Sequence, residues 1–234
     1  MRLIEWVKHK TSYRGDHDYK ESINNYTIKD GILAVLIFPA YVFFTYLGIQ
    51  IQIHTGSNII ALVTNTAVVL LVFIIIRLRK QNLYTVGIST DGWFKSSIVG
   101  FVIGMTFFML RVMGVIPAAF QAMGEQSVAF IIFYYFVVIS FSEEFMFRGY
   151  MQTRIYGIIK SSFWAVVVVG FLFALLHIII DIMFMRYFGS YARYTPRVWS
   201  LIQLTIIHVL INYLYRRYNS LVGPVILHGF LNLP

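Results

Sequence analysis

Cysteine is absent from the 234-residue chain, and charged residues are scarce. Without cysteine the protein has no disulfide framework, no thiol nucleophile and no thiolate metal site. Charged side chains make up only 12% of the residues, about half of the share in soluble domains. Residues 1–30 are polar and mixed in charge, so they lack the apolar core of a cleaved signal peptide. These absences exclude a disulfide-stabilised secreted domain and a typical soluble domain.

Hydrophobic residues make up 59% of the chain, and the mean hydropathy is +0.73. The last apolar run, 221–234, is too short to cross a bilayer and is expected to be a half-helix or a truncated span. The sequence predicts an all-α, polytopic transmembrane bundle of about six to eight helices with a polar site inside the membrane. Runs long enough to cross are predicted at 31–53, 58–76, 96–117, 128–151, 162–181 and 198–215.

The net charge of +9 could indicate a nucleic-acid partner, but Lys and Arg lie between the apolar runs. There they set membrane topology and meet anionic headgroups. With a cytoplasmic N-terminus, 15 of the 19 basic residues fall on the cytoplasmic side. We therefore expect a multi-pass integral membrane protein with its N-terminus in the cytoplasm, a lipid bilayer as its surroundings and no nucleic-acid partner. Its expected regions are an N-terminal cytoplasmic or interfacial segment (1–30), two leading spans (31–90) and a core (91–234).

Two adjacent carboxylates, Glu143 and Glu144, follow an apolar run of 14 residues, 128–141. A carboxylate in hydrocarbon is costly unless it is paired or hydrated. On a helix Glu144 and Arg148 lie on one face at i,i+4, the spacing at which an ion pair forms. Glu143 points about 100° away and lacks that partner. The pattern predicts a structural role for Glu144 and leaves Glu143 for chemistry.

A second buried polar residue, His177, is expected at the depth of Glu144. The turn between the fourth and fifth predicted spans falls near Lys160, 16 residues after Glu144 and 17 before His177. In an antiparallel helical hairpin both side chains lie about 25 Å from the turn. His228 follows Ser220 by only eight residues, so it reaches the others only if that hairpin projects beyond the membrane.

Carboxylates, imidazoles and an amide that converge inside a bilayer suit the activation of water against a carbonyl. Glu143 would be the general base, and His177 and His228 would hold the water directly or through a divalent metal. Zinc favours two histidines and a carboxylate, so the possible metal ligands are His177, His228 and Glu143. Asn232 can donate to an oxyanion. Asp181 is expected either to fix a histidine tautomer or to be an interfacial residue.

Three ordered motifs resemble those of one family: EEFMFR at 143–148 fits EExxxR, FALLH at 173–177 fits FxxxH, and HGFLN at 228–232 fits HxxxN. The chain resembles, over roughly residues 90–234, the CPBP intramembrane proteases, the CAAX-processing and bacteriocin-immunity (Abi) family. The resemblance implies an endopeptidase that cleaves peptides or membrane-anchored proteins within or beside a bacterial cell membrane. It implies a water-activating Glu143 and a site completed by the other motif residues, Glu144, Arg148, His177, His228 and Asn232.

The resemblance leaves several points open. The metal remains open, since a zinc mechanism and a metal-free glutamate mechanism both fit the family. Substrates could be CAAX-like proteins or peptides of the leader, pheromone or bacteriocin type. The alternatives are a non-catalytic membrane scaffold or self-immunity protein, and a small transporter, for which no inverted repeat is found. The chain ends two residues after Asn232, so we expect a final helix of the family to be missing or to have been removed.

Two further polar features are expected to have structural rather than catalytic roles. His208 and Asn212 also fit HxxxN, but they lack the Gly223-Pro224 sequence that precedes the other copy of the motif. We therefore expect them to make interhelical hydrogen bonds. Arg111 lies near the outer end of its span and is expected to extend its side chain to the membrane surface.

Overall fold

The computed structural model describes residues 21, 23–55, 59–89, 92–112, 127–188 and 198–233. These residues form helices and connecting turns with no strand, which confirms the predicted all-α class. The helices are α3 (Ile28–Thr55), α4 (Ile59–Leu78), η1 (Leu83–Val86), α5 (Trp93–Val112), α10 (Ser162–Phe188), α11 (Val198–Tyr218) and α12 (Val222–Asn232).

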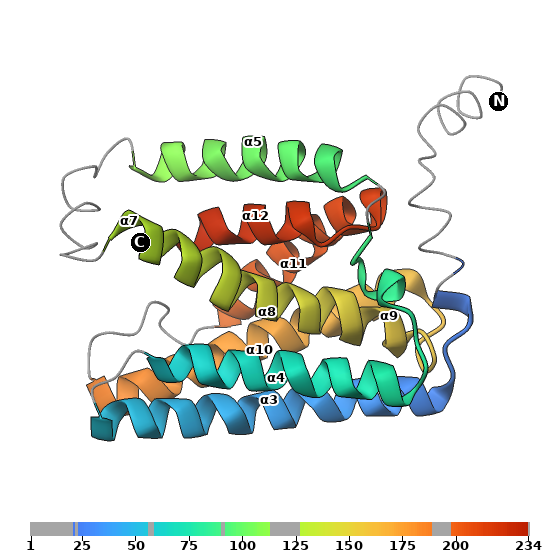
Figure 1. Ribbon diagram of the computed structural model, residues 1–234, viewed down its shortest axis with the longest axis horizontal. Coiled ribbons are helices and arrows are strands. Elements are labelled where there is room, and N and C mark those ends of the chain that lie inside the picture. Colours follow the sequence, from blue (N-terminus) through green and yellow to red (C-terminus); the bar gives the residue numbers. More distant parts are fainter. Residues whose placement is uncertain are drawn as a thin grey trace.

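The central rod runs from Val128 to Ile155 without a break. Two of its stretches are π-helical, with hydrogen bonds from residue i to i+5, and an α-helical turn separates them. In Figure 1 the rod lies between the α3–α4 pair on one side and α12 and α5 on the other. The rod comprises α7 (Val128–Ile132), η2 (Phe133–Ser140), α8 (Phe141–Glu143), η3 (Glu144–Met151) and α9 (Gln152–Ile155).

Four helices of the described chain are long and apolar enough to cross a membrane: Ile28–Thr55, Trp93–Arg111, Val128–Ile155 and Ser162–Met183. The second and sixth predicted spans are helices as well, but they are not among these four. The apolar part of α4 is shorter, Leu62–Leu78, and α11 carries Gln203, His208 and Asn212 within its apolar sequence. The protein is an integral membrane protein.

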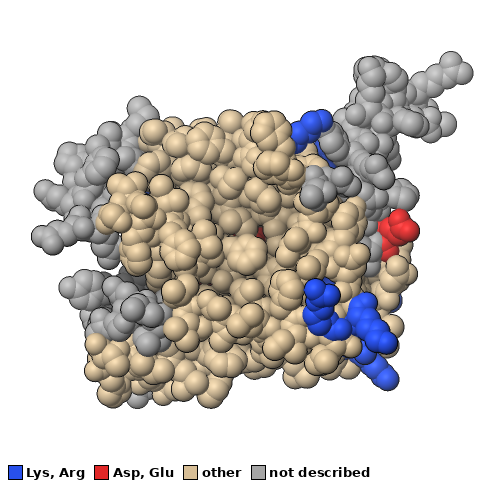
Figure 2. All heavy atoms as spheres, in the orientation of Figure 1, with Lys and Arg blue, Asp and Glu red and all other residues tan. Residues whose placement is uncertain are grey.

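Charged side chains gather at one end of the bundle. Figure 2 shows an uncharged band over most of one face, Lys and Arg at one end, and a narrow hollow with acidic atoms at its floor. The term basic end is used for the end of the bundle at which α3 and α10 begin and at which α11 finishes. An apolar band of this kind is what lipid tails require of a protein surface.

Some predictions fall on residues outside the described ranges. These are residues 1–20 and 22 of the N-terminal cytoplasmic or interfacial segment and residues 113–117 of the span predicted at 96–117.

The two leading helices pack into the same hydrophobic core as the rest of the bundle. This core joins Val72 of α4 and Tyr41 of α3 to Phe145 and Phe147 of η3 and Phe173 of α10. Phe73 stacks on Phe145 with 6.0 Å between ring centroids. As a result, α3 and α4 form one wall of the region that contains the paired glutamates.

Glycine permits the close approach of α5 and α12. A Cβ on Gly100 would lie 2.3 Å from the Gly223 carbonyl oxygen, and one on Gly223 would lie 2.4 Å from the Ser96 carbonyl oxygen. The Gly223 amide donates to Ser96 Oγ at 3.1 Å. This contact sets the position of α12, which carries His228.

The turn before α12 lies inside the bundle. Asn219 and Ser220 are buried, and the Leu221 amide donates to the Gly87 carbonyl at 3.0 Å. Leu221 lies so close to Gly149 that a Cβ there would be 3.4 Å from Leu221 Cδ1. α12 therefore starts only five residues along the rod from Glu144, so the short distance from Ser220 to His228 is enough to reach it.

Candidate active site

Glu143 and Glu144 lie where α8 meets η3, at the centre of the rod. Glu144 is completely buried, and Glu143 is 6% exposed. A π-helical stretch lies on each side of this junction. Such stretches are rare and often occur at functional sites, because the wider turn changes the direction of neighbouring side chains.

The Glu144 carboxylate bridges two partners. It forms the predicted i,i+4 ion pair with Arg148, which is itself completely buried. The same oxygen, Oε1, accepts a hydrogen bond from His228 Nδ1 at 2.7 Å. Arg148 Nη2 also donates to the His208 carbonyl of α11 at 3.2 Å. Glu144 thus links the rod to α12, and Arg148 links it to α11.

Glu143 faces both histidines of the predicted motifs. Its Oε2 atom lies 3.7 Å from His177 Nε2 and 3.6 Å from His228 Nε2. The prediction that the carboxylates and His177 lie at one depth is confirmed by this geometry. Because the turn before α12 is buried beside the rod, His228 reaches the same depth.

The hydrogen bonds at Nδ1 determine what the two imidazoles offer. His177 Nδ1 lies 3.0 Å from the Phe173 carbonyl, and His228 Nδ1 lies against the Glu144 carboxylate. Both partners only accept, so in the neutral rings Nδ1 carries the hydrogen and Nε2 presents a lone pair. Glu143 Oε2 is buried and has no hydrogen-bond partner among the described residues. Three acceptors therefore converge, and a water molecule can supply the donors that they lack.

The predicted metal ligands His177, His228 and Glu143 have suitable chemistry for zinc. Within the described part of the chain, however, no three His, Asp or Glu side chains are arranged so that they could hold one ion. The residues as placed therefore do not fit a metal ion.

The motif phenylalanine packs the site together. The Phe173 ring lies 4.5 Å from the His177 ring and 5.7 Å from the His228 ring, measured between centroids. It also makes an edge contact with Phe147 at 5.2 Å. The ring thus packs against both imidazoles that face Glu143.

Asn232, the predicted oxyanion donor, lies on α12 one turn after His228. Its amide donates to Ser140 Oγ at 3.3 Å, and Ser140 precedes Glu143 by three residues on the rod. The side chain is thus at the edge of the site, and its role toward an oxyanion stays a prediction.

Asp181 is buried on α10, and the Phe173 carbonyl lies 3.0 Å from His177 Nδ1, so a role of Asp181 toward a histidine tautomer stays a prediction.

Two residues of the leading helices were not predicted as part of the site. Tyr41 of α3 is buried, and its hydroxyl donates to Asn65 Oδ1 of α4 at 2.7 Å. Both line a cavity of about 180 Å³ whose lining also includes Glu143, Tyr134 and Ile180. Asn65 is a lone amide in an apolar run, and that was the only sequence signal for this pair.

The second HxxxN sequence has the structural role that we predicted. His208 Nε2 donates to Gln152 Oε1 at 3.0 Å, and Gln152 Nε2 donates to Asn212 Oδ1. These bonds join α11 to the end of the rod.

Arg111 was expected to extend its side chain to the membrane surface. It instead donates to the carbonyls of Leu231, at 3.1 Å, and Leu233, so it caps the last turn of α12.

The fold thus brings the glutamates and histidines of the three motifs together inside a membrane helix bundle. Residues 125–234 match the family described as type II CAAX prenyl endopeptidase Rce1-like. No curated protein and no solved structure matches the chain. This part of the chain therefore belongs to the CAAX-type intramembrane proteases, which confirms the resemblance seen in the three motifs. Membership of this family indicates a peptidase, hence a hydrolase.

Proposed function

We propose that the protein is an intramembrane endopeptidase in which Glu143 activates the attacking water. The observation that carries the proposal is the convergence of Glu143 Oε2 with the Nε2 atoms of His177 and His228. A water molecule has two hydrogens, so it can donate to Glu143 and to one imidazole at the same time. The other imidazole can accept from the N–H of the substrate peptide.

The reaction then follows general base catalysis. Glu143 takes a proton from the water while the oxygen attacks the carbonyl carbon of the scissile bond. The tetrahedral oxyanion is stabilised by a hydrogen bond from the Asn232 amide. When the C–N bond breaks, the departing amine takes the proton from Glu143, and the carboxylate returns to its starting state.

Glu144 and Arg148 act through His228 and are positioning residues. The Glu144 carboxylate accepts from His228 Nδ1 and so keeps the Nε2 lone pair directed at the site. Arg148 neutralises Glu144, since a lone buried carboxylate would otherwise be strongly unfavourable.

The substrate is a membrane-associated peptide or a membrane-anchored protein, of CAAX-like or leader-peptide type. The cavity beside Glu143 supports this assignment. Its wall combines apolar side chains with Tyr41, Asn65, Gln52 and Thr64, which can hydrogen bond to an extended peptide backbone. The two leading helices thus contribute to substrate binding, although they lie outside the matched region.

The test uses purified full-length protein and its Glu143→Gln variant with a library of membrane-anchored peptides, some of them prenylated. Products are identified by mass spectrometry, and the metal content is measured on the same samples. We expect cleavage by the wild type and none by the variant. Equal cleavage by both would remove Glu143 from the mechanism. If neither cleaves any peptide while both sustain the same cellular phenotype, the scaffold alternative replaces the protease.

A further inference from the structure

A second concave site lies between α10 and α11, away from the glutamates. It is a groove of about 390 Å³, and it shares no lining residue with the Glu143 cavity. Its volume falls in the range of roughly 300–1,000 Å³ that is typical of small-molecule sites. The catalytic proposal uses none of its residues. Its lining includes Phe163, Val166, Val209, Tyr213, Arg216 and Arg217.

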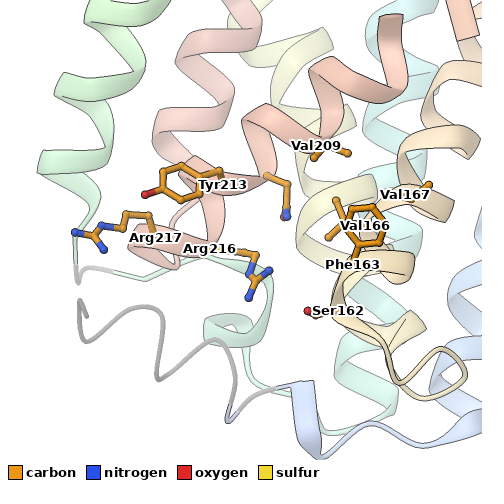
Figure 3. Close-up of a pocket in the computed structure, with 9 residues that line it drawn as sticks. Ser162, Phe163, Val166, Val167, Val209, Tyr213, Arg216 and Arg217 are labelled. Atoms are coloured by element: carbon orange, nitrogen blue, oxygen red, sulfur yellow. The ribbon is translucent and has the colours of Figure 1, made fainter. Parts of the chain in front are cut away.

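The groove is divided into an apolar part and a cationic part. Figure 3 shows Val209, Val166 and Phe163 along the groove, and Arg216 pointing toward Ser162 at the start of α10. Arg217 also lines the groove, and its side chain extends in the other direction, on the side of Tyr213. Both guanidinium groups come from the last turn of α11. The start of α10 adds the positive end of a long helix dipole to this cationic part.

The surroundings of the groove place it at the membrane surface. Phe163 is 61% exposed and Tyr213 72%, and both line the groove, while Trp164 beside Phe163 is 58% exposed, so aromatic rings lie at the outer surface of the bundle here. Exposed aromatic residues of this kind are enriched where headgroups meet acyl chains. The apolar wall continues into the lipid-facing surfaces of two helices, so an acyl chain can follow it without leaving the bilayer.

From this arrangement we propose that the groove binds one anionic phospholipid. The headgroup phosphate pairs with Arg216 and Arg217, and one acyl chain lies along Phe163, Val166 and Val209. Two guanidinium groups suit a phosphate, since each presents planar N–H donors to its oxygens. A zwitterionic lipid brings its own cation to the same place and is disfavoured there.

The test measures lipid retention by the full-length protein in native mass spectrometry. Wild type, the double variant Arg216→Gln/Arg217→Gln and the matched double variant Lys29→Gln/Lys80→Gln are each loaded with phosphatidylglycerol or phosphatidylcholine. Lys29 and Lys80 are exposed cations at the same end of the bundle, outside the groove. A further variant, Val209→Trp, fills the apolar part without changing charge.

We expect the wild type and the lysine variant to retain one phosphatidylglycerol and to prefer it over phosphatidylcholine. The arginine variant should bind it about 30-fold more weakly, since each basic residue near a membrane surface contributes to anionic-lipid binding. Val209→Trp should also lose retention.

Equal retention by all variants, or no preference for the anionic lipid, would overturn the proposal. A third result against it is full displacement by soluble glycerol phosphate, which would show that the site takes a free phosphate rather than a lipid. Because the readout is retention, a failure of the proposed protease activity leaves this test unaffected.

Discussion

At the level of single residues, two neighbouring glutamates differ in what surrounds them. Glu144 is held by a buried arginine and a histidine, whereas Glu143 Oε2 has no hydrogen-bond partner among the described residues and faces the Nε2 atoms of two histidines. The two carboxylates are adjacent in sequence, yet the Glu144 carboxylate accepts hydrogen bonds from its neighbours, whereas Glu143 Oε2 faces no donor in the described part of the chain. The difference arises because consecutive residues on a helix point about 100° apart.

Replacing each glutamate by glutamine should separate these roles. Glu143→Gln should abolish cleavage with little change in stability, because no ion pair is lost. Glu144→Gln leaves the Arg148 cation buried without its carboxylate, so we expect a loss of about 3–5 kcal/mol in stability as well as activity. Thermal unfolding in one detergent, beside cleavage rates, checks both. Equal melting temperatures for the two variants would contradict this assignment.

A smaller change at Tyr41 tests the contribution of α3. Tyr41→Phe removes the hydrogen bond to Asn65 beside Glu143, and a net hydrogen bond is worth about 1 kcal/mol. We expect the free energy of unfolding to fall by about 1 kcal/mol, kcat/KM to fall, and the choice of cleavage site to broaden because the wall beside Glu143 loses a fixed side chain. Tyr46→Phe is the control, since Tyr46 is 41% exposed on the same helix and does not line the cavity. If Tyr41→Phe has the wild-type kcat/KM and cleavage site, the Tyr41 hydroxyl of α3 does not contribute to substrate binding.

At the level of helices, the close crossing of α5 and α12 determines where His228 lies. The crossing depends on Gly100 and Gly223, whose missing side chains allow backbone contact. Since α12 has only 11 residues, a shift at this crossing is carried directly to His228.

Gly100→Leu should therefore impair the site from a distance. The added side chain meets Gly223 backbone atoms that cannot rotate away, so α12 must move. We expect at least a tenfold loss of cleavage and a destabilisation of about 1–3 kcal/mol, the usual effect of overpacking. Val102→Leu, on the exposed side of α5, should change neither. The measurement is the cleavage rate together with the melting temperature, and normal activity in Gly100→Leu would show that α12 is not fixed by this contact.

The sequence was informative about the site wherever helix periodicity was sufficient. Spacing along one helix predicted the Glu144–Arg148 pair, and equal depth in a hairpin predicted the contact of Glu143 with His177. It could not predict the Tyr41–Asn65 pair, because which spans are neighbours depends on the packing of the whole bundle. The buried turn before α12 was also missed, since a short polar sequence such as Tyr218-Asn219-Ser220 normally lies at the surface.

At the level of the whole molecule, the separation of charge along the bundle bears on orientation. We propose that the basic end faces the cytoplasm of a bacterial cell, in keeping with the positive-inside rule. Helix α3 has 28 residues, about 42 Å at 1.5 Å per residue, so it is long enough for its two ends to reach opposite sides of a membrane whose hydrocarbon core is about 30 Å thick.

The absence of native cysteine makes this orientation directly measurable. Lys29→Cys and Thr55→Cys place single thiols at exposed positions near the two ends of α3. In right-side-out vesicles a membrane-impermeant maleimide should label Thr55→Cys and spare Lys29→Cys, and inverted vesicles should give the reverse. Labelling in the opposite sense would reverse the proposed topology, and the unlabelled wild type serves as background.

The cavity beside Glu143 also limits the shape in which a substrate can be cut. Glu143 is only 6% exposed, so a substrate reaches it through this cavity rather than across an open surface. In a helical substrate each peptide carbonyl is hydrogen bonded to the amide four residues later, so we expect a membrane-spanning substrate to unwind one turn before its peptide bond is attacked at Glu143. The free energy needed to unwind that turn then helps to determine which substrates are cleaved. A glycine or proline beside the scissile bond lowers this free energy, so it should speed cleavage even if it makes no contact with the enzyme.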